Sequence, residues 1–316
     1  MRSSRFIPPA SKGFTLLEVL VSVSVLFLMI TILASMFDGV TMLVVLRNKE
    51  VDLDSQMRVV FDRMAIDFEN IVKRDDVNYY LKSDTAESGA PQNYDLTDSL
   101  PMANTNDQIA FYSTVPGYVP TSATAQASFS LVGYRLNTNT YRLERYGRNL
   151  LWNGATVTTS TGGSSYGDQP VFLPVTFGTT GQWPDVISSS ATDPDYEALG
   201  PTMFRFEYHY LLKSGALSTV PWDTTAGHTS VRGLQDVIAI GVDVAAIDSR
   251  SAKIVSTSTL GSLTTKLSDF NATTMGTPGS IEASWESVLQ GNSVAVPALA
   301  RPGLRVYHRY FYLSAN

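Results

Sequence analysis

The sequence of 316 residues contains no cysteine, which excludes disulfide bonds and metal sites built on thiolates. It has only three histidines, His209, His228 and His308, and these are far apart along the chain. Without clustered histidines, a zinc or other transition-metal site is not expected, and no other cofactor is implied. His209 and His308 fall on predicted strands beside charged neighbours, so we expect both to be exposed.

Signatures of catalysis and of nucleic-acid binding are missing as well. The chain has no G-x-S-x-G, H-E-x-x-H, P-loop or dinucleotide-binding pattern, so we predict that it is not an enzyme. Its formal net charge is −6, and no basic cluster stands out in the sequence. A dedicated nucleic-acid surface is therefore not expected.

Proline is absent between Pro9 and Pro91, and charge is nearly absent between Phe14 and Phe37, where Glu18 is the only charged residue. These 24 residues would rise about 36 Å as a helix, enough to cross a bilayer of about 30 Å. Residues 1–13 carry three basic side chains and no acid, which predicts a cytoplasmic leader. An ordinary secretory signal is the main alternative, but its apolar region would be shorter.

After this span, apolar residues recur every three or four positions, at Leu46, Leu53, Met57, Val60, Met64, Phe68 and Ile71. This is the period of an amphipathic helix. We predict one continuous helix over about residues 14–73, with residues 14–37 in the membrane. Residues 38–74 form its amphipathic half, which packs one stripe on a globular domain of residues 75–316.

Strand patterns dominate that domain, and strands are predicted at residues 108–115, 129–136, 141–146, 203–212, 237–246 and 304–313. The second and third should form a hairpin. The fourth alternates, with Phe204, Phe206, Tyr208 and Tyr210 predicted on a covered face, and Arg205, Glu207 and His209 on a wet one. Short helices are predicted at about 260–270 and 281–289, with polar loops at 75–107 and 188–201. The fold class is α+β, with the long helix on one face of a mainly antiparallel sheet.

One acidic turn offers hard oxygen ligands at close spacing: Asp193, Asp195 and Glu197. Calcium binds such groups, so these three residues are weak calcium candidates. The turn lacks the glycine and the distal glutamate of an EF-hand loop, and a solvated acidic loop is the favoured interpretation.

The stretch Lys12-Gly13-Phe14-Thr15-Leu16-Leu17-Glu18 joins the leader to the apolar span. A carboxylate in a membrane segment is costly and needs a partner. The stretch resembles the N-terminus of type IV prepilins and of the pseudopilins of type II secretion. The resemblance implies that a prepilin peptidase cuts between Gly13 and Phe14 and that the new Phe14 amine is methylated. It also implies that Glu18 pairs with a neighbouring subunit's amine during fibre assembly.

A second resemblance covers Val132-Gly133-Tyr134-Arg135-Leu136 and Tyr141-Arg142-Leu143-Glu144-Arg145, which are similar to a hairpin of J-type minor pseudopilins and W-type minor pilins. The chain is also similar to a member of a pilin-like cassette of Verrucomicrobia-type bacteria. These likenesses imply a minor subunit at or near the tip of a type II secretion pseudopilus. They further imply a single-pass inner-membrane precursor with a periplasmic domain, and other pilins and the assembly platform as partners. The alternatives are a minor pilin of a type IV pilus or DNA-uptake fibre, and a membrane-tethered binding module or enzyme.

Overall fold

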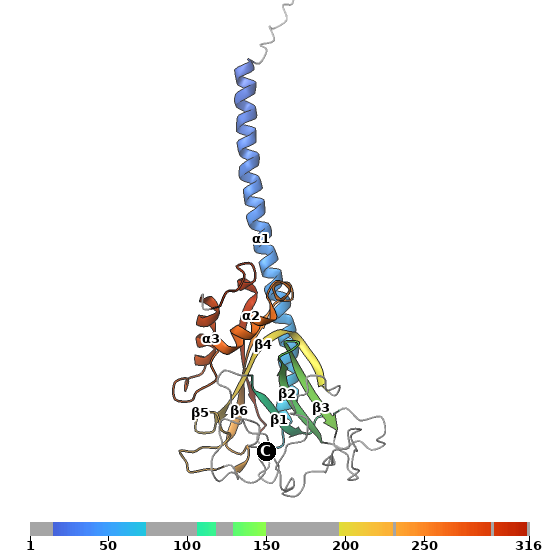
Figure 1. Cartoon of the computed structure of the whole chain (residues 1–316), viewed down its shortest axis with the longest axis vertical. Helices are drawn as coiled ribbons and strands as arrows, with labels where there is room; N and C mark the ends of the chain where they lie inside the picture. Colours follow the sequence, from blue (N-terminus) through green and yellow to red (C-terminus); the bar gives the residue numbers. More distant parts are fainter. Residues whose placement is uncertain are drawn as a thin grey trace, which may run out of the picture. The chain divides into compact units, whose positions relative to one another are not determined.

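A long helix, α1, runs from Leu16 to Glu69 in the computed structural model of the protein (Figure 1). The structure describes residues 15–73, 106–117, 129–149, 196–229, 232–291 and 294–314, with the backbone alone described for 38–50 and 148–149. The chain divides into two compact units, Met1–Asn48 and Lys49–Asn316, and α1 contributes to both. We describe each unit by itself, as unit 1 and unit 2.

Unit 2 is built on a seven-stranded sheet in which every described pair of strands is antiparallel. The order is β1-β2-β3-β4-β6-β7, and β5 pairs with β4. The strands are β1 (Gln108–Ser113), β2 (Ser130–Asn137), β3 (Arg142–Asn149), β4 (Tyr196–Leu212), β5 (Leu217–Ser218), β6 (Val237–Ile247) and β7 (Leu304–Tyr312). The predicted hairpin is confirmed, since β2 pairs with β3 from Asn137↔Arg142 outward.

The apolar stripe of α1 packs on one face of this sheet, as its spacing predicted. Leu53, Met57, Val60, Met64, Phe68 and Ile71 are all buried and share one core cluster with Phe206, Tyr208 and Tyr210 of β4. The helix ends four residues earlier than expected, because its following residues join the sheet. The backbone N–H of Thr114 donates to the carbonyl of Asn70 at 3.0 Å, and Ile71 forms a bridge with Ser113.

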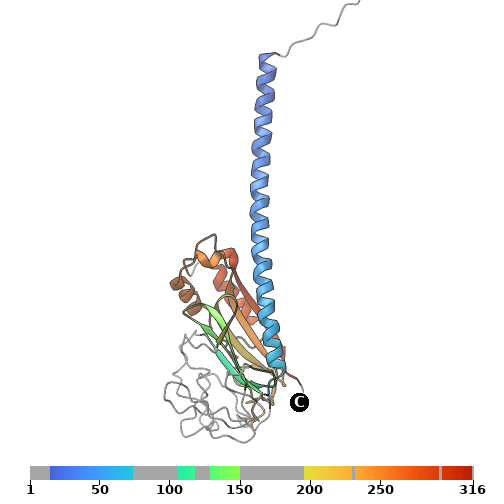
Figure 2. The ribbon, with the colours of Figure 1, turned by 90° about the vertical axis from the view of Figure 1, so that its right-hand side faces the viewer.

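The opposite face of the sheet is covered by α2 (Thr257–Lys266) and α3 (Ser280–Gln290), so the sheet lies between these helices and α1 (Figure 2). Helix α2 begins where the side chain of Ser256 accepts a hydrogen bond from the Thr259 N–H at 3.1 Å. A second core cluster joins Leu263 of α2 and Trp285 of α3 to the sheet. The described helices and strands therefore form an α+β arrangement, as predicted.

The prediction of a wet face on β4 is wrong. Arg205, Glu207 and His209 are at most 1% exposed, because α2, α3 and the segment between them cover this face. His308 of β7 has a side chain that is only 13% exposed, so the expected exposure of both strand histidines is wrong as well. Except at Phe204, alternation of polar and apolar residues separated the two faces of β4 correctly, but it did not indicate that the predicted short helices cover the second face.

Phe204 also lies on the opposite face from the one predicted. The β4–β6 register shifts between Met203 and Arg205, which makes Phe204 the additional residue of a β-bulge. Met203 therefore joins the core beneath α1, whereas Phe204 joins the core beneath α2 and α3. A bulge of one residue reverses the sides of all residues before it, which periodicity alone does not reveal.

Strand β4 begins at Tyr196, inside the segment predicted to be a polar loop ending at residue 201. Gly200 and Pro201 lie where the β3–β4 register is irregular, which lets the strand continue past both. Gly200 has a φ of 65°, and a Cβ at this position would collide with the side chain of Val60 on α1. The glycine thus permits the close approach of β4 to α1.

Candidate functional site

The N-terminal end of α1 is capped by Thr15. Its carbonyl accepts a hydrogen bond from the Val19 N–H at 3.2 Å, and its hydroxyl accepts one from the Glu18 N–H at 3.3 Å. Thr15-x-x-Glu18 therefore has the sequence of a capping box. One of the two hydrogen bonds of that motif is present, the one from the backbone N–H of Glu18 to the hydroxyl of Thr15. Glu18 is exposed in the first turn, where the helix dipole favours a carboxylate. Gly13 and Phe14, the predicted processing residues, lie outside the described residues.

The segment Leu16–Phe37 that follows is apolar on all sides. Its 22 residues are strongly hydrophobic, and the described part of the chain buries none of them. A core helix of a soluble protein would be buried, so this exposure argues against that interpretation. As a helix the segment is about 33 Å long, which matches the hydrocarbon core of a bilayer.

The few polar side chains in this segment are satisfied inside the helix. The hydroxyls of Ser22, Ser24, Thr31 and Ser35 each donate to a backbone carbonyl three or four residues earlier, at 2.7–2.8 Å. Hydroxyls bonded in this way carry little cost in hydrocarbon. Glu18 is therefore the one formal charge that lipid would leave unsatisfied along the segment, and its carboxylate calls for a partner from outside the segment.

In unit 2, α1 is fixed to the β2–β3 hairpin by a buried ionic network. The Asp67 carboxylate is fully buried and accepts two hydrogen bonds from Arg145, at 2.6 Å to Nε and 2.9 Å to Nη2. The Tyr134 hydroxyl donates to the same carboxylate at 2.5 Å. Burial and the negative charge of Asp67 raise the pKa of Tyr134 well above its usual value, so this hydroxyl remains a donor.

Sequence reasoning missed Asp67, although a signal was available. The residue falls between Met64 and Phe68 on the apolar stripe of α1, and a charge on a buried stripe indicates a buried partner.

Two exposed contacts also attach α1 to β7, the strand at one edge of the sheet. The Tyr307 hydroxyl donates to Asp54 at 2.6 Å, and Arg309 pairs with Asp62 at 3.0 Å.

A second polar cluster lies beneath α2 and α3. Asp243 of β6 is buried, with one carboxylate oxygen 2.8 Å from His308 Nδ1 and the other 3.4 Å from His209 Nδ1. The two imidazoles are stacked with 9° between their planes, and Phe270 stacks on His209. Across the described part of the chain, no group of three or more His, Asp or Glu side chains is arranged to hold a metal ion.

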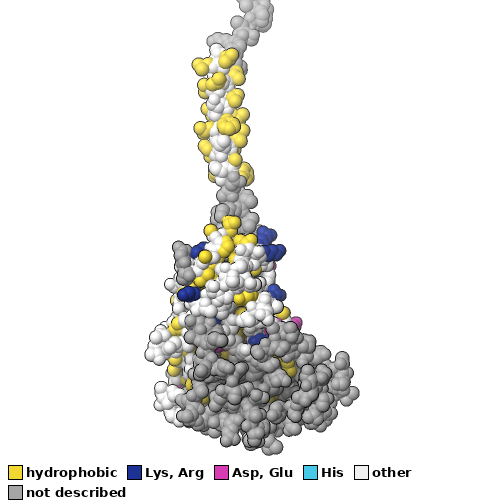
Figure 3. Space-filling view, in the orientation of Figure 1, with side chains coloured by type: hydrophobic (Ala, Val, Ile, Leu, Met, Phe, Trp, Pro, Cys, Tyr) yellow, Lys and Arg dark blue, Asp and Glu magenta, His cyan; other side chains and the backbone are white. Residues whose placement is uncertain are grey.

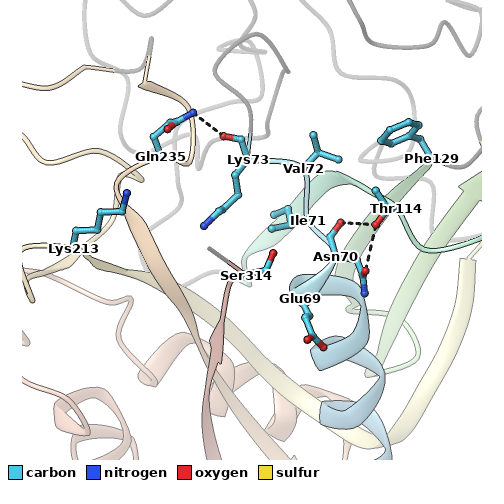
Figure 4. Close-up of a pocket in the computed structure, with 10 residues that line it drawn as sticks. All are labelled: Glu69, Asn70, Ile71, Val72, Lys73, Thr114, Phe129, Lys213, Gln235 and Ser314. Carbon is cyan, nitrogen blue, oxygen red and sulfur yellow. Dashed lines mark hydrogen bonds between the residues drawn. The ribbon is translucent and has the colours of Figure 1, made fainter. Parts of the chain in front are cut away.

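A cavity of about 480 Å³ lies at the C-terminal end of α1 (Figure 4). It is lined by Glu69, Asn70, Ile71, Val72, Lys73, Thr114, Phe129, Lys213, Gln235 and Ser314. Burial, and then the charge of Lys213, lower the pKa of Lys73. Each lysine of the lining therefore disfavours the positive charge of the other.

The calcium candidates are only partly described. Asp193 and Asp195 lie outside the described residues, and Glu197 is an exposed residue of β4 opposite Arg145 in the register. Glu197 therefore belongs to a strand and not to a turn. Calcium binding by this group stays a prediction.

The N-terminal residues match a family model described as the prokaryotic N-terminal methylation motif, over residues 9–34. No curated protein matches the chain. The matched motif and the apolar helix at Leu16–Phe37 together support a type IV pilin-like protein, a class of subunits that are usually not enzymes. The motif implies processing by a prepilin peptidase and assembly with other pilins, and the helix fits single-pass membrane anchoring.

Proposed function

We propose that this chain is a structural minor pseudopilin, inserted in the inner membrane and assembled at or near the tip of a type II secretion pseudopilus. The observation that carries the proposal is the prepilin motif at residues 9–34, which overlaps a 22-residue apolar helix that the described residues of the chain leave exposed. Such a helix needs lipid before assembly and other apolar helices after it. The orientation that we propose leaves the basic leader in the cytoplasm and unit 2 in the periplasm.

Assembly would use the N-terminus that processing creates. Cleavage between Gly13 and Phe14 produces a positive α-amine at the head of an apolar helix. The Glu18 carboxylate of an adjacent subunit is a suitable partner for that amine, because attraction between opposite charges is strong where water is excluded. Pairing of this kind would select one axial offset between neighbouring helices. Partners under this proposal are the prepilin peptidase, other pseudopilins and the inner-membrane assembly platform.

A minor role is supported by the size of unit 2. It runs from Lys49 to Asn316 and carries α2 and α3 on the sheet face opposite α1. Such additions are difficult to pack between neighbouring subunits along a whole fibre, whereas a single subunit at the end of the fibre has room for them. We infer a non-enzymatic, structural role. A minor pilin of a type IV pilus or DNA-uptake fibre has the same assembly physics and is the second candidate.

Intact-mass analysis of the protein isolated from its native membrane tests the processing step. The mature chain should begin at Phe14 and carry a methyl group on its amine. A mature N-terminus at residue 37 or beyond would contradict the proposal, since an ordinary signal peptidase would then have acted. Gly13→Ala should leave the leader attached, whereas Ser11→Ala, the matched control in the same leader, should be processed normally.

Co-purification with the pilin-like proteins of its host separates the two fibre types. A pseudopilin should be recovered with subunits whose loss blocks secretion of a folded protein. A pilus subunit should instead be recovered from sheared surface fibres. Recovery with neither would leave the chain outside both systems and would overturn the proposed function.

A further inference from the structure

Two segments of unit 2 carry basic residues and no acids, in a chain whose net charge is −6. Residues 249–268 contain Arg250, Lys253 and Lys266, and residues 294–306 contain Arg301 and Arg305. Both segments lie at the junction of β6 and β7. The first follows β6 and includes the 3-10 helix η4 (Ser251–Lys253), and the second precedes β7 and includes the 3-10 helix η5 (Arg301–Gly303).

The fold brings these segments side by side. Ile247 is opposite Leu304 in the β6–β7 register, and the Asp248 N–H donates to the Gly303 carbonyl at 3.1 Å. The Asp248 side chain is turned inward, where it accepts hydrogen bonds from the N–H groups of Arg250 and Ser251 at 3.0 and 3.1 Å. The acid at this junction is thus 3% exposed, while its basic neighbours point outward.

Exposed apolar side chains accompany the basic ones. Ile254 is 51% exposed and Leu299 is 74% exposed, next to η4 and η5 respectively. We call this group the η4–η5 surface and define it as Arg250, Lys253, Ile254, Leu299 and Arg305. Arg250, Lys253 and Arg305 are all exposed. Cations interleaved with protruding apolar groups are the pattern of a surface that meets an anionic membrane.

The η4–η5 surface lies at the end of unit 2 where α1 enters it. Tyr307 of β7 contacts Asp54 of α1, and Arg309 contacts Asp62, so β7 and α1 run in the same direction. The start of β7 therefore lies toward Lys49. At this end Figure 3 shows Lys and Arg side chains in dark blue beside hydrophobic side chains in yellow.

Two acids of α1, Asp52 and Asp54, lie near the same end. Each already accepts a hydrogen bond, Asp52 from the Gln56 amide at 3.1 Å and Asp54 from the Tyr307 hydroxyl. Only eleven residues lie between Phe37, the end of the apolar segment, and Lys49, the first residue of unit 2. This short connection tethers unit 2, along the chain, to the segment that we propose lies in the membrane.

We propose that the η4–η5 surface docks on anionic phospholipid headgroups of the membrane in which α1 is anchored. Arg250, Lys253 and Arg305 would contact the headgroup phosphates, and Ile254 and Leu299 would enter the interfacial region. Docking would hold unit 2 against the membrane before assembly, and extraction into a fibre would release it. The inference rests on the proposed membrane anchoring of α1, so the test reports on both.

The absence of cysteine permits a site-specific test on the full chain. Single variants Ile254→Cys, Ala226→Cys and Val25→Cys are labelled with a fluorophore sensitive to polarity and reconstituted in vesicles. One set of vesicles contains phosphatidylcholine alone, and the other contains about one third phosphatidylglycerol. Residue 226 is exposed in the loop before β6, at the end of that strand away from Ile247, and serves as the control position.

The label at residue 254 should shift to shorter wavelength in the anionic vesicles only, and nitroxide-bearing lipids should quench it there. The label at residue 226 should not respond to lipid composition. Raising the salt concentration to about 0.5 M should reduce the shift at 254, because ions screen contacts between exposed charges. Arg250→Gln with Lys253→Gln should abolish the shift. Lys213→Gln with Arg232→Gln, which removes the same charge at the opposite end of β6, should leave it intact.

Equal emission from residue 254 in both kinds of vesicle would overturn the inference, as would an equal shift at residue 226. The label at residue 25 distinguishes this failure from a failure of the proposed function. If residue 25 reports a hydrocarbon environment while residue 254 does not respond, membrane anchoring stands and docking is wrong. If residue 25 remains in water, anchoring and docking are both wrong.

Discussion

Asp67 of α1 and Arg145 of β3 form a bidentate ion pair that is buried between the long helix and the β2–β3 hairpin. Arg145 is held in its charged form, because the hydrogen bonds and charge of Asp67 outweigh the effect of burial and raise the pKa of the guanidinium. A pair of this kind need not add stability relative to an apolar pair, but removal of one partner leaves a buried charge. The pair therefore penalises any other register of the helix on the sheet.

Asp67→Ala should lower the free energy of unfolding by about 3–5 kcal/mol, since it leaves Arg145 buried without its partner. Asp62→Ala is the matched control, because it breaks the exposed pair with Arg309 and should cost at most about 1 kcal/mol. Urea denaturation followed by tryptophan fluorescence measures both. The double variant Asp67→Leu with Arg145→Met should be more stable than Asp67→Ala. Equal losses for Asp67→Ala and Asp62→Ala would contradict the burial of this pair.

Gly200→Ala should destabilise unit 2 by more than Gly215→Ala. Both glycines have positive φ, at 65° and 85°, so an L side chain is strained at either position by about 1–2 kcal/mol. Only at Gly200 would the new methyl group also collide with Val60, whereas nothing lies within 4 Å of the equivalent position at Gly215. Unfolding measurements on the two variants isolate the close approach of β4 to α1. Similar losses would mean that this approach is not tight.

Stability should depend on pH through Asp243 and His308. Burial disfavours a charged His308, but its hydrogen bond to Asp243 and the nearby charges of Asp243 and Glu282 raise its pKa above 6.5. The stabilisation is complete below 6.5 and is lost as the pH rises through the pKa in the folded state. For Asp243, burial is outweighed by the neighbouring imidazole of His209 and by the hydrogen bond with His308, which lower its pKa below 3.8. That contribution is present above 3.8 and is lost as the pH falls through the lowered pKa.

Denaturation midpoints measured between pH 4 and pH 9 should therefore be highest from about pH 4 to 6.5 and should decline above this range. His308→Gln should flatten the decline. His228→Gln, which alters a more exposed histidine beside Asp236, controls for histidine content. The assignment is wrong if His308→Gln retains the full decline between pH 6.5 and pH 9. The titratable groups that face the pair are His209, Tyr310 and Glu282. Because the charge of Glu282 helps to raise the pKa of His308, Glu282→Gln should shift the decline to lower pH.

Glu18→Ala should insert in the membrane at least as well as the wild type, because it removes a charge from the apolar segment. It should nevertheless enter fibres or tip complexes poorly, since the proposed partner of the Phe14 amine is lost. Membrane-fraction abundance and recovery with crosslinked pseudopilus measure the two effects separately. Ser22→Ala, one turn further along α1, is the control and should assemble normally. Glu18→Gln retains hydrogen-bonding capacity without the charge.

Wild-type assembly and secretion by Glu18→Ala would show that the charge has no assembly role. A subunit at the extreme tip has no neighbour above it, so crosslinks to the subunit below must be measured as well. A loss of helix capping is a different failure, which circular dichroism of Thr15→Val detects, because that variant removes the hydroxyl that accepts from the Glu18 N–H.

Local patterns in the sequence determined much of this protein. The period of Leu53, Met57, Val60, Met64 and Phe68 identified the helical stripe, and residues 129–146 were predicted as a hairpin. The prepilin motif was also readable directly, because its chemistry lies within a few consecutive residues. In each case the physical cause, whether helical period, strand alternation or a turn, acts between near neighbours in the chain.

Tertiary structure decided the rest. The bulge that moves Phe204 to the other face arises from the pairing of β4 with β6, and the burial of His209 and His308 arises from α2, α3 and the segment between them, which cover that face of the sheet. The pairing of Asp67 with Arg145 joins residues 78 positions apart. The sequence contained each of these side chains, but their partners are chosen by strand register and by the packing of layers, which no local period encodes.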